Sequence, residues 1–234
     1  MSFVYTGPSW AASSFPLDGQ TTSLAKEWGF PCINQSRVAT TILDQLKFIP
    51  KNNTKPIVWV YGEPLFSYEE ITGVSISDLI KRADWDVVRK QCNDFCLDAI
   101  NALGVPVLII GAHSDIVDCN YNNITVAHPS WQRYLAEQAN MVVHNNKIFV
   151  EIDDGSNFII DTCWGAEVLH RFMHEHPEVT PSHEVTTAIW DIFFFWKELE
   201  KADLFFDVHP NYRGNKLFAE HLKPTVAKFL QENQ

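Results

Sequence analysis

Short apolar runs alternate with helical patterns along almost the whole chain, and this alternation is the feature that most constrains the fold. Runs suited to buried strands occur at residues 3–6, 31–34, 57–61 and 105–111, with a less regular run at 203–208. Patterns typical of helices occur at residues 21–28, 37–48, 83–103, 130–141, 184–199 and 214–230. Strands that alternate with helices form a parallel sheet covered on both faces. We therefore expect an α/β fold, a three-layer α/β/α sandwich with a mostly parallel sheet.

The length of 234 residues and the hydrophobic share of 46% are enough for one sizeable core. No stretch rich in Pro, Gly or Ser divides the chain, so we expect a single domain over residues 1–234. Within 142–180, the runs at 147–151 and 158–161 flank Asp154-Gly155, a pair typical of a tight turn. This pattern predicts a hairpin insertion.

The charge distribution argues against nucleic acid as a partner. The formal net charge is −11, and the 18 basic residues are spread along the chain without a stripe that would neutralise phosphates. No apolar run approaches the length of about 18 residues that a membrane span needs. The N-terminus lacks the charged and apolar regions of a signal peptide, and five cysteines show no disulfide spacing. We expect a cytoplasmic protein with no membrane partner.

Two residues stand where an α/β sheet presents its reactive groups. Ser9 follows the strand-like run 3–6, and His209 precedes the helical pattern 214–230. A serine hydroxyl becomes a good nucleophile when an imidazole takes its proton, and the imidazole needs an acceptor on its other nitrogen. The structural alternative is that Ser9 caps a helix and His209 is a turn residue.

The segments Gly7-Pro8-Ser9-Trp10 and Phe206-Asp207-Val208-His209-Pro210 resemble two sequence blocks of the SGNH/GDSL hydrolases, in particular the divergent forms found in bacteriophages. The resemblance implies a flavodoxin-like sheet, Ser9 as nucleophile and His209 as base. It also implies a small ester as substrate, such as an O-acetyl group on a carbohydrate, and no cofactor or metal. A phage protein of this kind acts in the host cytoplasm or in a virion.

The acid that orients His209 is less well defined. The position of the family aspartate is occupied by Phe206, while Asp207 stands two residues before His209. Residues two apart in an extended segment point to the same side, so we predict that Asp207 orients the imidazole, with Asp203 as the alternative.

The groups that would stabilise an oxyanion depart most from the family pattern. The resemblance assigns this task to the segments around Asn34, Ser36 and Gly62, as backbone N–H or amide donors. Glu63 stands where an asparagine is expected, and an ionised carboxylate is an acceptor that cannot hold an oxyanion.

Three residues are predicted to line the substrate pocket. Trp10 adjoins the nucleophile, Glu63 follows a strand-like run, and His113 follows the run 105–111 at the same predicted sheet edge. For His113, the structural alternative is an ordinary loop histidine.

Two other classes of function stay open. The altered oxyanion segments are compatible with a non-catalytic binding or virion-associated module that keeps the hydrolase fold. A metal-dependent hydrolase is the other, because His170 and His174 lie one turn apart on a predicted helix, with His176 just beyond. The sequence leaves the ester and the oligomeric state open.

Overall fold

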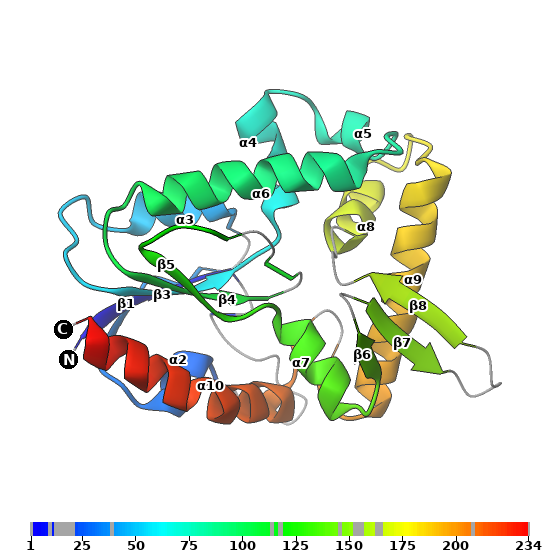
Figure 1. The fold of residues 1–234 in the computed structure, drawn as a ribbon. Coiled ribbons are helices and arrows are strands. Elements are labelled where there is room, and N and C mark those ends of the chain that lie inside the picture. The colour runs from blue at the N-terminus through cyan, green and yellow to red at the C-terminus, as the bar shows by residue number, and fades with distance from the viewer. Residues whose placement is uncertain are drawn as a thin grey trace.

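The structure is a computed structural model that describes residues 2–8, 11, 22–37, 40–112, 115–116, 119–144, 147–151, 157–161, 166–206 and 209–233. Within these ranges, the centre is a five-stranded sheet in the order β2-β1-β3-β4-β5, with every neighbouring pair parallel. Helices cover both faces of this sheet (Figure 1). The predicted three-layer α/β/α sandwich is confirmed.

The central strands are buried along their whole length. All residues of β1 (Phe3–Thr6), β3 (Ile57–Tyr61) and β4 (Val107–Gly111) are buried. Parallel strands covered on both faces require continuous apolar runs, which is why these three are visible in the sequence. The edge strands β2 (Cys32–Asn34) and β5 (Ile124–His128) are partly exposed. The sequence of β5 contains both polar and apolar residues. It therefore shows no apolar run, and this strand was not predicted.

One face of the sheet packs against α3 (Ile42–Phe48) and α6 (Trp85–Asn101). The other face packs against α2 (Leu24–Trp28), α7 (Trp131–Gln138) and α10 (Tyr212–Glu232) (Figure 1). Side chains alternate between these two cores along each strand, as the pleat requires. These five helices fall within the predicted ranges or begin and end within two residues of them.

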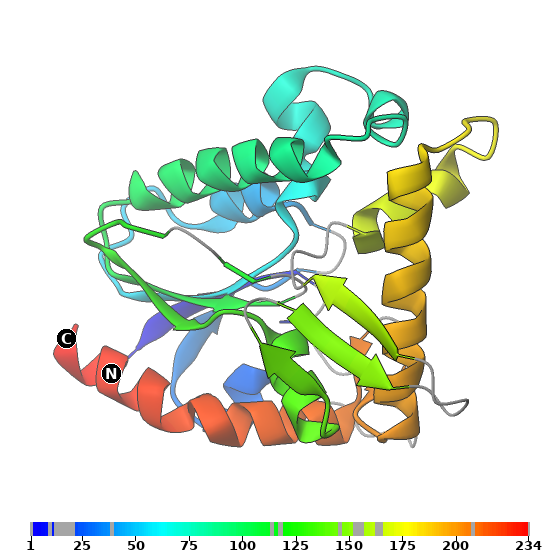
Figure 2. The same ribbon diagram turned by 45° about the vertical axis from the view of Figure 1, so that its right-hand side comes forward.

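The region 142–180 forms a separate layer at the end of the sheet. β6 (Val142–His144), β7 (Lys147–Glu151) and β8 (Asn157–Asp161) form an antiparallel sheet, so the two strands of the predicted hairpin are paired and a third strand adjoins them. The predicted turn at Asp154-Gly155 lies outside the described residues. α8 (Ala166–Glu175) follows, and α9 (His183–Lys201) packs against β8 (Figure 2).

The prediction that residues 203–208 form a strand of the central sheet is wrong. β9 (Phe205–Phe206) pairs with β10 (His209–Pro210) in a separate antiparallel pair. Asp203 has a φ of 56°, a left-handed conformation that ends α9 and interrupts an extended run.

Three short elements after β3 were not predicted: η1 (Pro64–Ser67), α4 (Tyr68–Thr72) and α5 (Ile76–Leu79). Each has at most five residues, too few to show a helical period in the sequence. Among the described helices, none is both long and apolar enough to cross a bilayer.

The close approach of β1 to β3 leads to a test of stability. A Cβ on Gly7 would lie 2.6 Å from Ala11 Cβ and 2.7 Å from Val60 O, whereas a Cβ on Gly73 would meet nothing within 4 Å. Both glycines have positive φ, but the φ of 152° at Gly7 is harder for an alanine to adopt than the φ of 68° at Gly73, so the difference combines a backbone cost with the packing cost. Gly7→Ala is expected to lower the free energy of unfolding by about 3 kcal/mol, and Gly73→Ala by about 1 kcal/mol. Urea denaturation measures both, and equal costs would contradict this view of the β1–β3 contact.

Candidate active site

The strand order places a candidate site at the carboxyl ends of β1 and β3. The chain moves from β1 to β2 on one side and then crosses to β3 on the other, so the direction of strand addition reverses at β1. In open α/β sheets, ligands bind in the crevice outside the strand ends at such a switch point. The residues that follow β1 and β3 therefore form the starting point for the site.

The turn after β1 packs directly on the end of β3. Gly7 fits only because it has no side chain, as the distances to Ala11 and Val60 show. A Cβ on Gly62 would lie 3.1 Å from Cγ of Pro8, so Pro8 covers Gly62 closely. Pro8 has no N–H to continue the β ladder, which lets the chain leave the sheet here.

The segment after β2 closes the other side of this turn. The N–H of Gln35 donates to Tyr5 O at 2.8 Å, and the N–H of Arg37 donates to Gly7 O at 3.0 Å. Three segments, 7–8, 35–37 and 62–63, therefore meet at one edge of the sheet. They are the segments that the sequence analysis assigned to the nucleophile turn and to the oxyanion donors.

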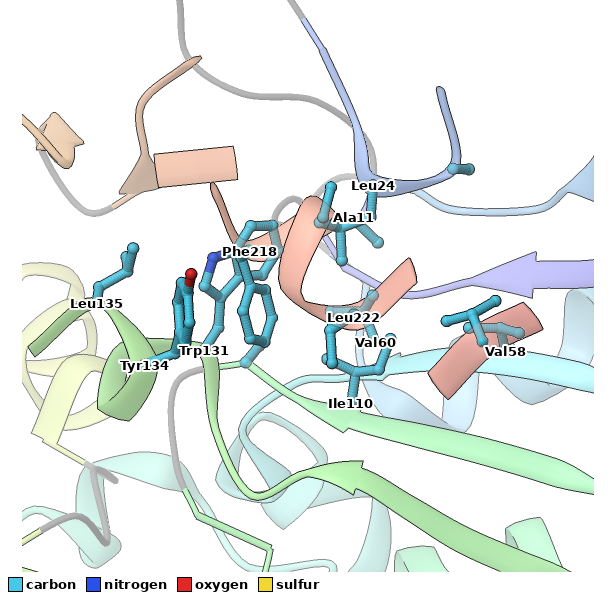
Figure 3. Close-up of a cluster of buried hydrophobic side chains, with 14 of the residues drawn as sticks. Ala11, Leu24, Val58, Val60, Ile110, Trp131, Tyr134, Leu135, Phe218 and Leu222 are labelled. Atoms are coloured by element: carbon cyan, nitrogen blue, oxygen red, sulfur yellow. The ribbon is translucent and has the colours of Figure 1, made fainter. Parts of the chain in front are cut away.

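Ser9 and Trp10 lie outside the described residues, between Pro8 and Ala11. The N–H of Ala11 donates to Pro8 O at 2.9 Å, and Ala11 O accepts from the hydroxyl of Tyr5 at 3.0 Å. Ala11 is fully buried in a cluster with Leu24 and with residues of α10 (Figure 3). The chain on both sides of Ser9 is thus anchored.

His209 lies at the start of β10, and contacts with the start of α10 hold this segment in place. The N–H of Asn211 donates to Leu204 O at 3.2 Å, and the side-chain oxygen of Asn211 caps α10 by accepting from the N–H of Gly214 at 2.9 Å. The side chain of Asn215 donates to Pro210 O at 3.1 Å. The ring of His209 is half-buried and its Nδ1 is shielded from solvent.

Of the two acids proposed to orient His209, only Asp203 lies among the described residues. Asp207 lies outside the described residues. The exposed carboxylate of Asp203 accepts from the Asn211 side chain at 3.2 Å and from Arg213 at 3.5 Å. Because Asp203 supports the turn through these two residues, Asp207 stays our prediction for the orienting acid.

The structure distinguishes the candidate oxyanion donors. The N–H of Ser36 donates to Oδ1 of Asn34 at 2.9 Å, and the Ser36 hydroxyl donates to the same oxygen at 2.6 Å. The N–H of Gly62 makes no hydrogen bond within the described part of the chain, and it lies beside Pro8 at the switch point. Gly62 is therefore the better placed donor, because Ser36 would first have to release Asn34.

Glu63 is buried beneath the site. Its side chain is 0% exposed and pairs with Nε of Arg89, whose side chain is 5% exposed, at 3.0 Å. Its carboxylate also accepts from the N–H of Leu65 at 3.2 Å, which caps η1. We predicted that Glu63 lines a substrate pocket; in the structure its carboxylate instead joins the end of β3 to α6.

A cavity of about 590 Å³ lies between the first halves of α6 and α9, a size suited to a small ligand. Arg89 and Asn93 line it from α6. Asn93 accepts a hydrogen bond from the hydroxyl of Tyr61 at 3.0 Å. The residues on either side of Gly62 are thus bonded to two residues of the cavity wall.

Sequence reasoning missed Arg89, Asn93 and Gln132. Within the amphipathic pattern of α6, a charged or amide residue is typical of a solvated face, so nothing singled out the first two. Gln132 is fully buried where α7 begins, and its N–H donates to Ala112 O at 3.3 Å. Its side-chain amide has no hydrogen-bond partner among the described residues. His113, predicted to line the pocket, follows Ala112 and lies outside the described residues.

The histidines proposed for a metal site give no support to that alternative. His174 is exposed on α8, and Nδ1 of His176 lies 3.4 Å from the carboxylate of Glu178. The side chain of His170 is not among those described. Within the described residues, no group of three or more His, Cys, Asp or Glu side chains has the arrangement of a metal site.

Comparisons of this chain with protein-family models, with curated proteins and with solved structures found no match.

The buried pair beneath the site gives a second prediction. Arg89→Met leaves the Glu63 carboxylate buried without its cation, and the expected loss in the free energy of unfolding is about 3 kcal/mol or more. The double variant Glu63→Gln/Arg89→Met should recover part of that loss, because no charge is then buried. Lys90→Met breaks the exposed pair with Asp94 and serves as control, with an expected loss below about 1 kcal/mol. Chemical denaturation measures all three, and an Arg89 loss no larger than the Lys90 loss would contradict the assignment.

Proposed function

We propose that the protein is a serine esterase that hydrolyses a small ester through an acyl-enzyme. Ser9 is the nucleophile, His209 the base and Asp207 the residue that orients His209. The main support is the convergence of two segments that are far apart in the chain. Ala11, two residues after Ser9, packs in one buried cluster with Phe218 and Leu222 of α10, the helix that begins just after His209 (Figure 3).

The proposed chemistry follows from these assignments. The Ser9 hydroxyl attacks the ester carbonyl while His209 takes its proton, and His209 then gives that proton to the departing alcohol. Water, activated by the same imidazole, hydrolyses the acyl-enzyme. A histidine with a shielded Nδ1 and a half-exposed ring suits this task, because a general base needs an orienting acid at one ring nitrogen and the nucleophile at the other.

The proposed oxyanion donors are the N–H groups of Ser9 and Gly62. The N–H of Gly62 lies at the switch point without a hydrogen bond to any described residue. Two preorganised donors of this kind are the usual minimum for stabilising a tetrahedral intermediate. The substrate class that the family resemblance suggests is an O-acetyl ester of a carbohydrate, and the reaction needs no cofactor.

A second candidate is a binding module that keeps the hydrolase fold without turnover. It is favoured by the oxyanion segments, because the N–H of Ser36 is bonded to Asn34 and Glu63 provides no amide donor. Loss of one oxyanion donor typically lowers turnover about 10² to 10³-fold. Measured activity separates the two candidates.

The test is hydrolysis of a short-chain aryl ester. Ser9→Ala and His209→Ala should each lower kcat/KM to a similar floor, because nucleophile and base act as one unit. Asp207→Asn should cost less, since it changes the orientation and charge of the imidazole without removing a reacting group. Ser77→Ala, at a partly exposed position of α5, is the control and should behave as wild type.

Two results would count against the esterase. Wild-type turnover no greater than that of Ser9→Ala, over several acyl lengths, would favour the binding module. Activity that a chelator removes and zinc restores would favour a metal-dependent hydrolase.

A further inference from the structure

Three carboxylates line the cavity between α6 and α9, and the dipoles of these two helices account for only two of them. Its lining includes the carboxylates of Asp86, Glu184 and Asp191. Asp86 and Glu184 lie in the first turns of their helices, where acids stabilise the helix dipole. Asp191 lies in the middle of α9, where that explanation does not apply.

The positive charges of the cavity wall are already paired. Arg89 pairs with Glu63 beneath the site, and Lys90 lies 3.3 Å from Asp94. The carboxylates of Asp86, Glu184 and Asp191, by contrast, make no hydrogen bond or ion pair with any residue that the structure describes. The cavity therefore presents a net negative surface to anything that enters it.

Asp191 and Trp85 indicate the kind of ligand. Burial raises the pKa of Asp191, so its charged form carries a desolvation cost that a cation in the cavity would offset. Trp85 is partly exposed and lines the same cavity. A tryptophan ring beside carboxylates suits an organic ammonium group, which is attracted to both.

The cavity is also coupled to the candidate active site. Arg89 is bonded to Glu63, and Asn93 is bonded to Tyr61, so both sides of Gly62 contact the cavity wall. The first turns of α6 and α9 lie beyond the end of the sheet where β1 and β3 finish (Figures 1 and 2).

We propose that this cavity receives the alcohol half of the ester and selects alcohols that carry a positively charged ammonium group. The role of the cavity in binding an ester rests on the proposed esterase function. The affinity of the cavity for ammonium groups does not depend on that function. Carboxylates disfavour anionic alcohols at the same place by like-charge repulsion.

Two esters of the same shape provide the test: acetylcholine and its neutral isostere 3,3-dimethylbutyl acetate, assayed at pH 8. The expected kcat/KM ratio is about tenfold in favour of the cationic ester at low salt, and it should fall as ionic strength rises. Asp191→Asn and Trp85→Leu should each lower this ratio several-fold. Glu220→Gln removes an exposed carboxylate on α10, outside the cavity, and should leave the ratio unchanged.

A wild-type ratio of one or less, or a ratio that Asp191→Asn does not change, would overturn the proposal. If neither ester is hydrolysed, calorimetric titration with choline and with 3,3-dimethylbutanol decides the matter without catalysis. Choline binding that Asp191→Asn weakens would support the ammonium site and count against the esterase. Equal binding of the two alcohols, or no binding of either, would refute the ammonium site.

Discussion

The contact between the ends of β1 and β3 is the constraint on which the candidate site depends. Gly7 approaches Val60 so closely that no side chain fits, and Pro8 covers Gly62. This contact ends the pairing of β1 with β3 and directs the chain out of the sheet at the switch point. The same contact places the N–H of Gly62 beside the turn that leads to Ser9. The backbone contact that stabilises this part of the fold therefore also positions the proposed oxyanion donor.

The buried pair of Glu63 and Arg89 extends this geometry into the helical layer. A carboxylate and a guanidinium that are both removed from water must be retained together, because loss of one leaves a buried charge. The pair fixes the chain after Gly62, and its arginine forms part of the wall of the cavity between α6 and α9. One ion pair thus links the proposed oxyanion donor to the proposed site for the alcohol.

The sequence predicts those parts of the fold that depend on local patterns. The buried strands β1, β3 and β4 are visible because burial on both faces demands unbroken apolar runs, whereas β5 is an edge strand with a mixed pattern and escapes prediction. The candidate site is predictable only in part. Ser9 and His209 have local signals, but the burial of Glu63 depends on Arg89, a residue far away in sequence that no local pattern connects to it.

The most direct test of the central claim is labelling of the nucleophile. An alkyl fluorophosphonate reacts with an activated serine, whose oxygen displaces fluoride from phosphorus, and a serine without a base nearby reacts far more slowly. The account predicts one adduct per chain, on Ser9 by peptide mass mapping, that is lost in His209→Ala although Ser9 is still present. Labelling of another residue, equal labelling in His209→Ala, or no labelling of the folded protein would contradict the claim that Ser9 and His209 form a nucleophile and its base.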